Sequence, residues 1–119
     1  EIIKNKSDNF TVLSGDDAIT LPLLSIGVEG VISVVANALP ERFSNMVHSA
    51  ISGDLATANQ EHYDLFHITR LMFAEGNPGG VKEALGYRGV CSNHMRLPLV
   101  PVSDELKAQI NEEMKLLMG

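Results

Sequence analysis

Two short groups of polar residues in this chain could do chemistry. The first is Ser14-Gly15-Asp16-Asp17, and the second is formed by Ser33 and Asn37. Carboxylates can act in general acid–base chemistry. When they directly precede a helix, however, they more often cap it and interact with its dipole. We therefore interpret Asp16 and Asp17 first as caps, and Ser33 and Asn37 as loop-forming groups rather than substrate ligands.

The segments ahead of these polar groups must position them. Residues 10–14 and 30–34 are nearly all apolar, which predicts two short strands that are buried on both faces. Such strands are typical of parallel sheets and α/β barrels, where functional residues collect at the carboxyl ends of the strands. Two strands cannot close a barrel, so we expect the chain to be the tail of a longer protein that starts upstream of Glu1.

A short helix is predicted between these strands, over Ala18 to Ile26. Pro22 is awkward inside a helix because proline removes a hydrogen bond and clashes with the preceding turn. The helix can avoid this problem by starting late, with Thr20 as its cap, or by having a tight first turn. Gly27 is placed to end it.

After Asn37 the hydrophobic period is helical. Pro40 and Gly53 bound one predicted helix, and Asp54 caps a longer one that continues to Phe73. The remaining predictions, in chain order, are a turn at 76–80, a short helix at 81–85, an irregular connection at 87–102 and a last helix capped by Ser103. The predicted architecture is thus α/β but mostly helical by residue count, with two β/α units of a barrel in 1–53 and a helical domain in 54–119.

Composition excludes several classes of function. The formal net charge is −6, and the nine lysines and arginines are scattered, so no basic stripe is available for nucleic acid. No apolar run approaches the ~20 residues that span a bilayer. Cys91 is the single cysteine. It cannot form a disulfide within the chain, which favours a cytoplasmic location.

A metal site is not expected from the four histidines. Zinc ligands usually occur in tight pairs, whereas His62 and His67 are five residues apart and point to different faces of a helix. Gly79-Gly80-Val81-Lys82 has some likeness to a phosphate-binding loop. It lacks the P-loop spacing and the hydroxyl residue, so a turn is the better interpretation.

Four sequence motifs occur together in an order that is shared with a known family. They are Leu13-Ser14-Gly15-Asp16-Asp17, Gly30–Val34 with Ala36-Asn37, Asn77-Pro78 with Lys82, and Arg96-Leu97-Pro98 with Pro101. With these motifs the chain resembles the carboxyl-terminal segment of the dihydrodipicolinate (4-hydroxy-tetrahydrodipicolinate) synthase family. These are pyruvate-dependent class I aldolases, related to N-acetylneuraminate lyase. Gly79-Gly80 departs from the family pattern, where a bulkier residue and a second proline are common.

The resemblance implies a lyase with a TIM (β/α)8 barrel, to which this chain contributes the last two strands and a helical appendage. Family members form a Schiff base between pyruvate and a buried lysine. The resulting enamine adds to aspartate semialdehyde in the route to diaminopimelate and lysine. The resemblance also implies a cytoplasmic homotetramer that needs no metal or organic cofactor. The helix around Leu21 to Ile26 resembles the element that joins two dimers of such a tetramer.

The catalytic residues of the family are expected upstream of this chain. A Schiff-base lysine needs a desolvated setting, and none of Lys4, Lys6, Lys82, Lys107 and Lys115 lies in a segment that predicts one. We therefore predict no catalytic residue here and an inactive isolated segment.

Two substrate-binding residues are implied by the resemblance. The backbone carbonyl of Ile32 would face the pyruvate adduct, although an isoleucine at this place would otherwise be barrel core. Gly15 would lie beside the semialdehyde, although a glycine there also suits a strand-to-loop turn.

Two alternatives stay open. One is a related lyase for another 2-keto acid, such as N-acetylneuraminate lyase. The other is a free-standing helical interaction module. The second is disfavoured because it would leave two doubly apolar strands uncovered. Each exposed Val, Leu or Ile in them would forgo about 1.5–3 kcal/mol of burial energy.

Overall fold

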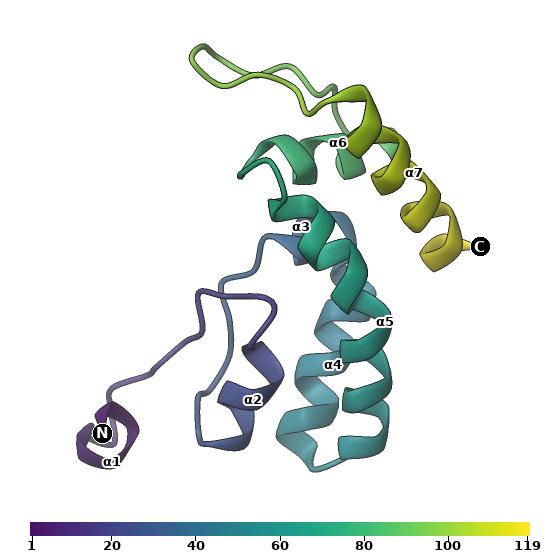
Figure 1. Ribbon diagram of the computed structural model, residues 1–119. Helices are drawn as coiled ribbons and strands as arrows, with labels where there is room; N and C mark the ends of the chain where they lie inside the picture. Colours follow the sequence, from purple (N-terminus) through teal and green to yellow (C-terminus); the bar gives the residue numbers. More distant parts are fainter.

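The computed structural model describes residues 1–119, and its regular structure is helical (Figure 1). The helices are α1 (Ile2–Asn5), α2 (Thr20–Ser25), α3 (Val35–Ala38), α4 (Pro40–Ser52), α5 (Leu55–Phe73), α6 (Gly79–Tyr87) and α7 (Asp104–Met118). None of them has both the length and the apolar character that crossing a membrane requires. The prediction of a mostly helical chain is confirmed.

The α4–α5 hairpin has the ends that the sequence predicts. Pro40 is in the first turn of α4, and Gly53 follows its last residue with a left-handed φ of 88°. The Asp54 side chain then accepts a hydrogen bond from the Thr57 amide at 3.1 Å and caps α5. Arg42 on α4 joins the two helices through ion pairs to carboxylates of α5.

Helix α2 starts at Thr20, two residues later than predicted, and Thr20 is its first residue rather than its cap. The late start removes the difficulty with Pro22. A proline in the first turn lacks only an N–H group that has no intrahelical partner in any case. Gly27 ends this segment with a φ of 96°, as predicted.

Helix α6 starts at Gly79 and not at Val81, so the prediction of a turn through Gly80 is wrong. The reason is its close packing on α5. A Cβ atom on Gly80 would lie 2.3 Å from the carbonyl oxygen of Met72, so only glycine fits. The helix also extends beyond Leu85 to Tyr87, and its neighbour Arg88 donates a hydrogen bond of 2.6 Å to the Ala38 carbonyl at the end of α3.

The irregular connection before α7 and the cap of that helix agree with the prediction. The side chain of Ser103 accepts a hydrogen bond from the Leu106 amide at 3.2 Å. The Ser103 amide also donates to Glu75 Oε2 at 2.8 Å, which fastens the start of α7 to the end of α5. Residues 88–102 project from the body at the upper left of Figure 1.

The two predicted strands are not regular strands, which corrects that part of the prediction. They meet in a single parallel bridge between Ser14 and Val31. Ser14 N donates to Gly30 O at 2.8 Å, and Ile32 N donates to Ser14 O at 2.9 Å. Each segment has only the other as a neighbour, so its second edge is unpaired and little regular ladder forms. The predicted parallel direction and adjacency are confirmed.

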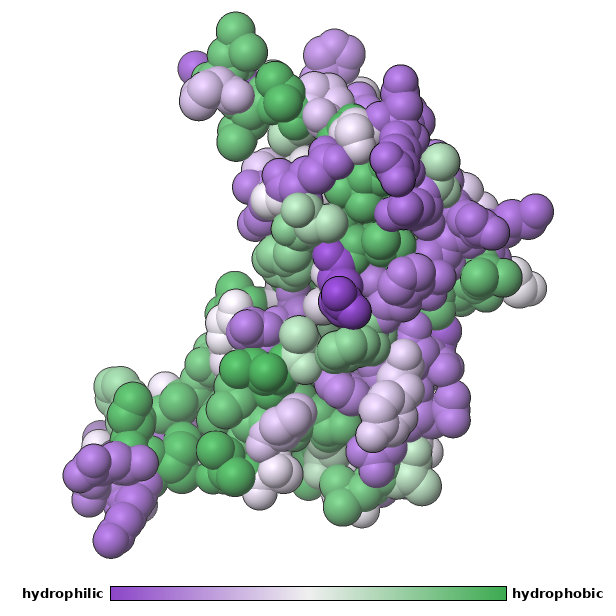
Figure 2. Space-filling model, in the orientation of Figure 1, coloured by the Kyte–Doolittle hydropathy of each residue, from purple (hydrophilic) through white to green (hydrophobic).

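One hydrophobic cluster of 16 buried residues holds helices α2 to α7 together. It extends from Leu21 on α2 to Met114 on α7, and therefore crosses the predicted boundary at Gly53. The bridged segments lie at its margin. Phe10, Leu13 and Ile32 are exposed there, and Figure 2 shows extensive hydrophobic surface on this side, at the lower left.

Candidate functional site

The loop that follows the first bridged segment is held by a local hydrogen-bond network. The Ser14 hydroxyl donates to the Asp16 carbonyl at 3.0 Å and accepts from the Asp16 amide at 3.1 Å. The Thr20 hydroxyl, which is fully buried, donates to the same carbonyl at 2.7 Å. These bonds fix the backbone on both sides of Gly15, which has no side chain to pack.

Gly15 and Ile32, the two predicted binding residues, lie at equivalent places in the two segments. Each is one residue beyond the bridged pair of Ser14 and Val31, and the segments run in parallel. The structure therefore brings Gly15 and Ile32 to the same end of the bridged pair, which we call the rim. The Ile32 side chain is 72% exposed, so it is not core in this chain. Its amide is bonded to Ser14, while its carbonyl oxygen accepts no hydrogen bond from the chain.

The two aspartates have different roles. Asp16 is exposed, and its Oδ1 atom accepts a hydrogen bond from the Ala18 amide at 2.9 Å, which is a local turn. Asp17 is buried, and its Oδ2 atom accepts hydrogen bonds from the amides of Val34 and Val35 at 3.0 and 3.3 Å. Asp16 therefore caps no helix, which corrects the cap interpretation for that residue, while for Asp17 the interpretation is right in kind. Asp17, however, caps α3 and not the helix that follows it in sequence, which sequence spacing could not indicate.

Ser33 lies in the loop that leads into α3, and Asn37 lies within α3 itself. The Ser33 hydroxyl accepts a hydrogen bond from the Ala36 amide at 2.8 Å. The Asn37 side-chain amide donates to the carbonyls of Ser33 and Val34 at 3.2 and 3.0 Å. Ser33 is thus loop-forming, as predicted, whereas Asn37 is helical and its side chain bonds back to the loop, which corrects the prediction for Asn37.

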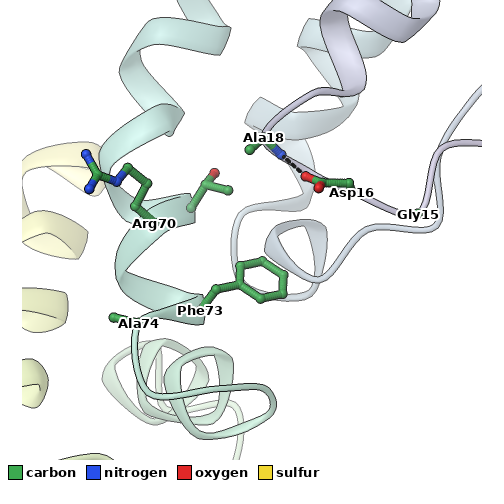
Figure 3. A pocket seen from close by; sticks show the side chains of 7 residues that line it. Gly15, Asp16, Ala18, Arg70, Phe73 and Ala74 are labelled. Carbon is green, nitrogen blue, oxygen red and sulfur yellow. Dashed lines mark hydrogen bonds between the residues drawn. The ribbon is translucent and has the colours of Figure 1, made fainter.

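A cavity of about 450 Å³ lies between the Gly15 loop and the carboxyl-terminal half of α5. It is lined by Gly15, Asp16, Ala18, Thr69, Arg70, Phe73 and Ala74. In Figure 3 the ring of Phe73 extends toward the loop, whereas the Arg70 guanidinium points away from it. Phe73 follows the hydrophobic period of α5 and would by that pattern be core, but it is 42% exposed and forms a wall of this cavity. No sequence signal separates these two roles, because Phe73 continues the helical period.

The histidines are dispersed over the helical part. His67 Nδ1 lies 3.0 Å from Glu113 Oε2. The ring of His62 makes aromatic contacts with Tyr63 and Phe66, and burial lowers its pKa. None of these groups faces the rim that carries Gly15 and Ile32.

No lysine of the chain is buried. Lys6 pairs with Glu29 at 3.1 Å, and Lys107 lies 3.5 Å from Glu83. The chain therefore has no amine in a desolvated setting.

Comparison with solved structures identifies the class of protein that has this arrangement. The crystal structure of dihydrodipicolinate synthase from Aquifex aeolicus matches 98% of the chain with a TM-score of 0.93 and 38% sequence identity. The chloride-inhibited dihydrodipicolinate synthase from Acinetobacter baumannii, complexed with pyruvate, matches 89% with a TM-score of 0.84 and 32% identity. These are TIM-barrel enzymes, and the match covers 40% and 36% of the two chains.

The family assignment follows from the sequence comparisons. The model of the dihydrodipicolinate synthetase family matches residues 1–117, so the chain belongs to this family. A relative named 4-hydroxy-tetrahydrodipicolinate synthase, from Phocaeicola vulgatus, is 47% identical over 116 residues. That alignment covers 94% of this chain and 39% of the relative. The chain thus spans about two fifths of the length of the curated relatives that it matches.

Proposed function

We propose that the chain is the carboxyl-terminal part of a 4-hydroxy-tetrahydrodipicolinate synthase, a lyase of lysine and diaminopimelate biosynthesis. The observation that supports this most strongly is the family match over nearly the whole chain, together with relatives of that name at 47% and 44% identity. The intact protein would condense pyruvate with aspartate semialdehyde. The Acinetobacter baumannii enzyme, whose structure contains pyruvate, supports the first substrate.

In the proposed architecture residues 1–53 form the last two β/α units of a (β/α)8 barrel, and residues 54–119 form the helical domain. The exposed side chains of Leu13 and Ile32 support this arrangement, because further strands of a barrel would cover them. The parallel direction of the two bridged segments supports it too.

The proposed chemistry depends on a lysine outside this chain. Its neutral amine attacks the keto carbon of pyruvate, water leaves, and loss of a methyl proton gives an enamine. The enamine carbon then adds to the aldehyde carbon of aspartate semialdehyde, and hydrolysis later frees the lysine. The Ile32 carbonyl would face the pyruvate adduct, and Gly15 would let the semialdehyde approach. Their position at one rim, and the free Ile32 carbonyl oxygen, support these roles.

The proposed assembly is a cytoplasmic homotetramer without a metal or organic cofactor. Ile26, directly after α2, is 62% exposed, as expected of a residue that contacts a second subunit. Sedimentation of the intact protein would test the tetramer.

The test of the function uses the intact protein that contains this chain. Purified enzyme is incubated with pyruvate and aspartate semialdehyde, and the condensation product is measured through its reduction by a coupled reductase. Turnover is expected, and borohydride should trap pyruvate on one lysine. If cleavage of N-acetylneuraminate is faster, or if no pyruvate is trapped, the assignment is wrong.

The isolated chain of residues 1–119 provides the matched control. It has no buried lysine, so incubation with pyruvate and borohydride should leave its intact mass unchanged. A stoichiometric pyruvate adduct on this chain would show that one of its own lysines is the nucleophile.

A further inference from the structure

Within this chain, Ile32 is held by hydrogen bonds to its backbone. Its side chain is 72% exposed, so packing within the chain cannot hold it. The bridge to Ser14 secures the amide of Ile32 at 2.9 Å. The carbonyl side of the residue needs a second attachment if its direction is to be fixed.

Asp17 supplies that attachment. Its Oδ2 atom accepts hydrogen bonds from the amides of Val34 and Val35, which follow Ile32 by two and three residues. The Ile32 carbonyl therefore lies between the bridge on one side and the Asp17 contact on the other. The same aspartate is two residues beyond Gly15. One side chain thus joins the two loops that carry the proposed binding residues.

The burial of Asp17 makes its two hydrogen bonds necessary. The residue is only 4% exposed, and a buried carboxylate is costly unless it is hydrogen-bonded. Bonds to an ionised acceptor are roughly twice as strong as bonds between neutral groups. The Oδ1 atom is also buried and has no partner, so the two amides on Oδ2 are the bonds that hold the side chain in place.

Building on the function proposed above, we propose that Asp17 is a positioning residue of the synthase. It does not touch the substrates. It fixes the Ile32 carbonyl and the Gly15 backbone relative to each other, so that the pyruvate adduct and the semialdehyde meet in reactive alignment. Displacements of about 1 Å at such a site can cost about 100-fold in rate.

The experiment compares Asp17→Ala and Asp17→Asn in the intact enzyme. The alanine variant loses both bonds, and its kcat should fall about 10- to 100-fold, with a smaller change in KM for either substrate. The asparagine variant keeps a neutral acceptor, and its kcat should fall only about 3- to 10-fold because neutral hydrogen bonds are weaker. Wild-type kcat in either folded variant would overturn the proposal. Asp17→Asn decides the matter if Asp17→Ala does not fold.

Glu83→Ala is the matched control for a structural effect. Glu83 is a buried carboxylate on α6 that accepts a hydrogen bond from Asn93 at 2.9 Å, outside both loops. Its loss should lower Tm but leave kcat at the wild-type value. Equal kcat losses in the Glu83 and Asp17 variants would reduce the role of Asp17 to stability.

Borohydride trapping separates the two proposals. The Asp17 variants should still trap one pyruvate, because the lysine itself is unchanged, and they should turn over slowly. A wild-type enzyme that traps no pyruvate would refute the proposed function. A wild-type enzyme that traps pyruvate, beside Asp17 variants with normal kcat, would refute only the role of Asp17.

Discussion

At the scale of single residues, glycines at two places have opposite reasons to be glycine. Gly80 is enclosed, since a Cβ atom there would lie 2.3 Å from the Met72 carbonyl oxygen. Gly15 is open, with no heavy atom beyond its two chain neighbours within 4 Å of the position of a Cβ atom. The first glycine is thus required by packing. The second is free for substrate approach, in the function proposed here.

Gly80→Ala should therefore destabilise the protein. The added methyl group must push α6 away from α5, at a cost of about 1–3 kcal/mol for overpacking, although alanine favours the helix by about 1 kcal/mol. Thermal unfolding followed by circular dichroism would measure the lower Tm. Gly15→Ala is the control, with Tm unchanged and kcat/KM for the semialdehyde reduced. An unchanged Tm for Gly80→Ala would mean that α6 moves away freely.

At the scale of elements, the sequence predicts helix ends that depend on nearby residues, but it does not predict features that depend on contacts between distant residues. Pro40, Gly53 and Asp54 define the ends of α4 and α5 through contacts within a few residues, and these ends were predicted correctly. The start of α6 was predicted two residues too late, because Gly80 lies in the helix where it packs against α5. The partner of Asp17 was missed for the same reason, since it lies 17 residues away.

The hydrogen bonds between Glu75 and Ser103 join the end of α5 to the start of α7, and we expect their contribution to stability to depend on pH. Glu75 accepts hydrogen bonds from the side chain and the amide of Ser103, and these bonds lower the pKa of Glu75. A carboxylate with a lowered folded-state pKa stabilises the fold above its unfolded pKa. That contribution is lost as the pH falls through the folded-state value.

Glu75→Gln should therefore be less stable than the wild type at pH 7 and equally stable in acid. The difference should begin to shrink near the ordinary glutamate pKa of about 4.3 and disappear as the pH falls through the lower folded-state pKa. Urea unfolding at a series of pH values measures it. Asp8→Asn removes an exposed carboxylate without such partners and should keep the wild-type pH dependence. Parallel curves for Glu75→Gln and the wild type would exclude this role of Glu75.

At the scale of the whole molecule, the helical part is well packed and the bridged segments are not. The sequence motifs were sufficient to predict the family and the parallel pairing. They could not predict that regular strands are missing, because strand formation depends on further neighbouring strands and an isolated pair is only marginally stable. The domain boundary near Gly53 stays a prediction, as do the roles of Gly15 and Ile32 toward substrate.

The isolated chain should self-associate. Phe10, Leu13 and Ile32 are between 46% and 72% exposed, and the unpaired backbone beside them can pair with another copy. Sedimentation velocity at micromolar concentration should show dimers or larger species. A single monomeric species would instead favour the free-standing helical module.

Arg88 connects the helical appendage to the rim by way of the Ala38 carbonyl. That carbonyl ends the short helix whose first amide Asp17 holds. We therefore expect a substitution of Arg88 to disturb α3 and, through the Asp17 contact, the backbone near Ile32. Engineering aimed at the catalytic properties of such an enzyme need not be confined to the mouth of its barrel.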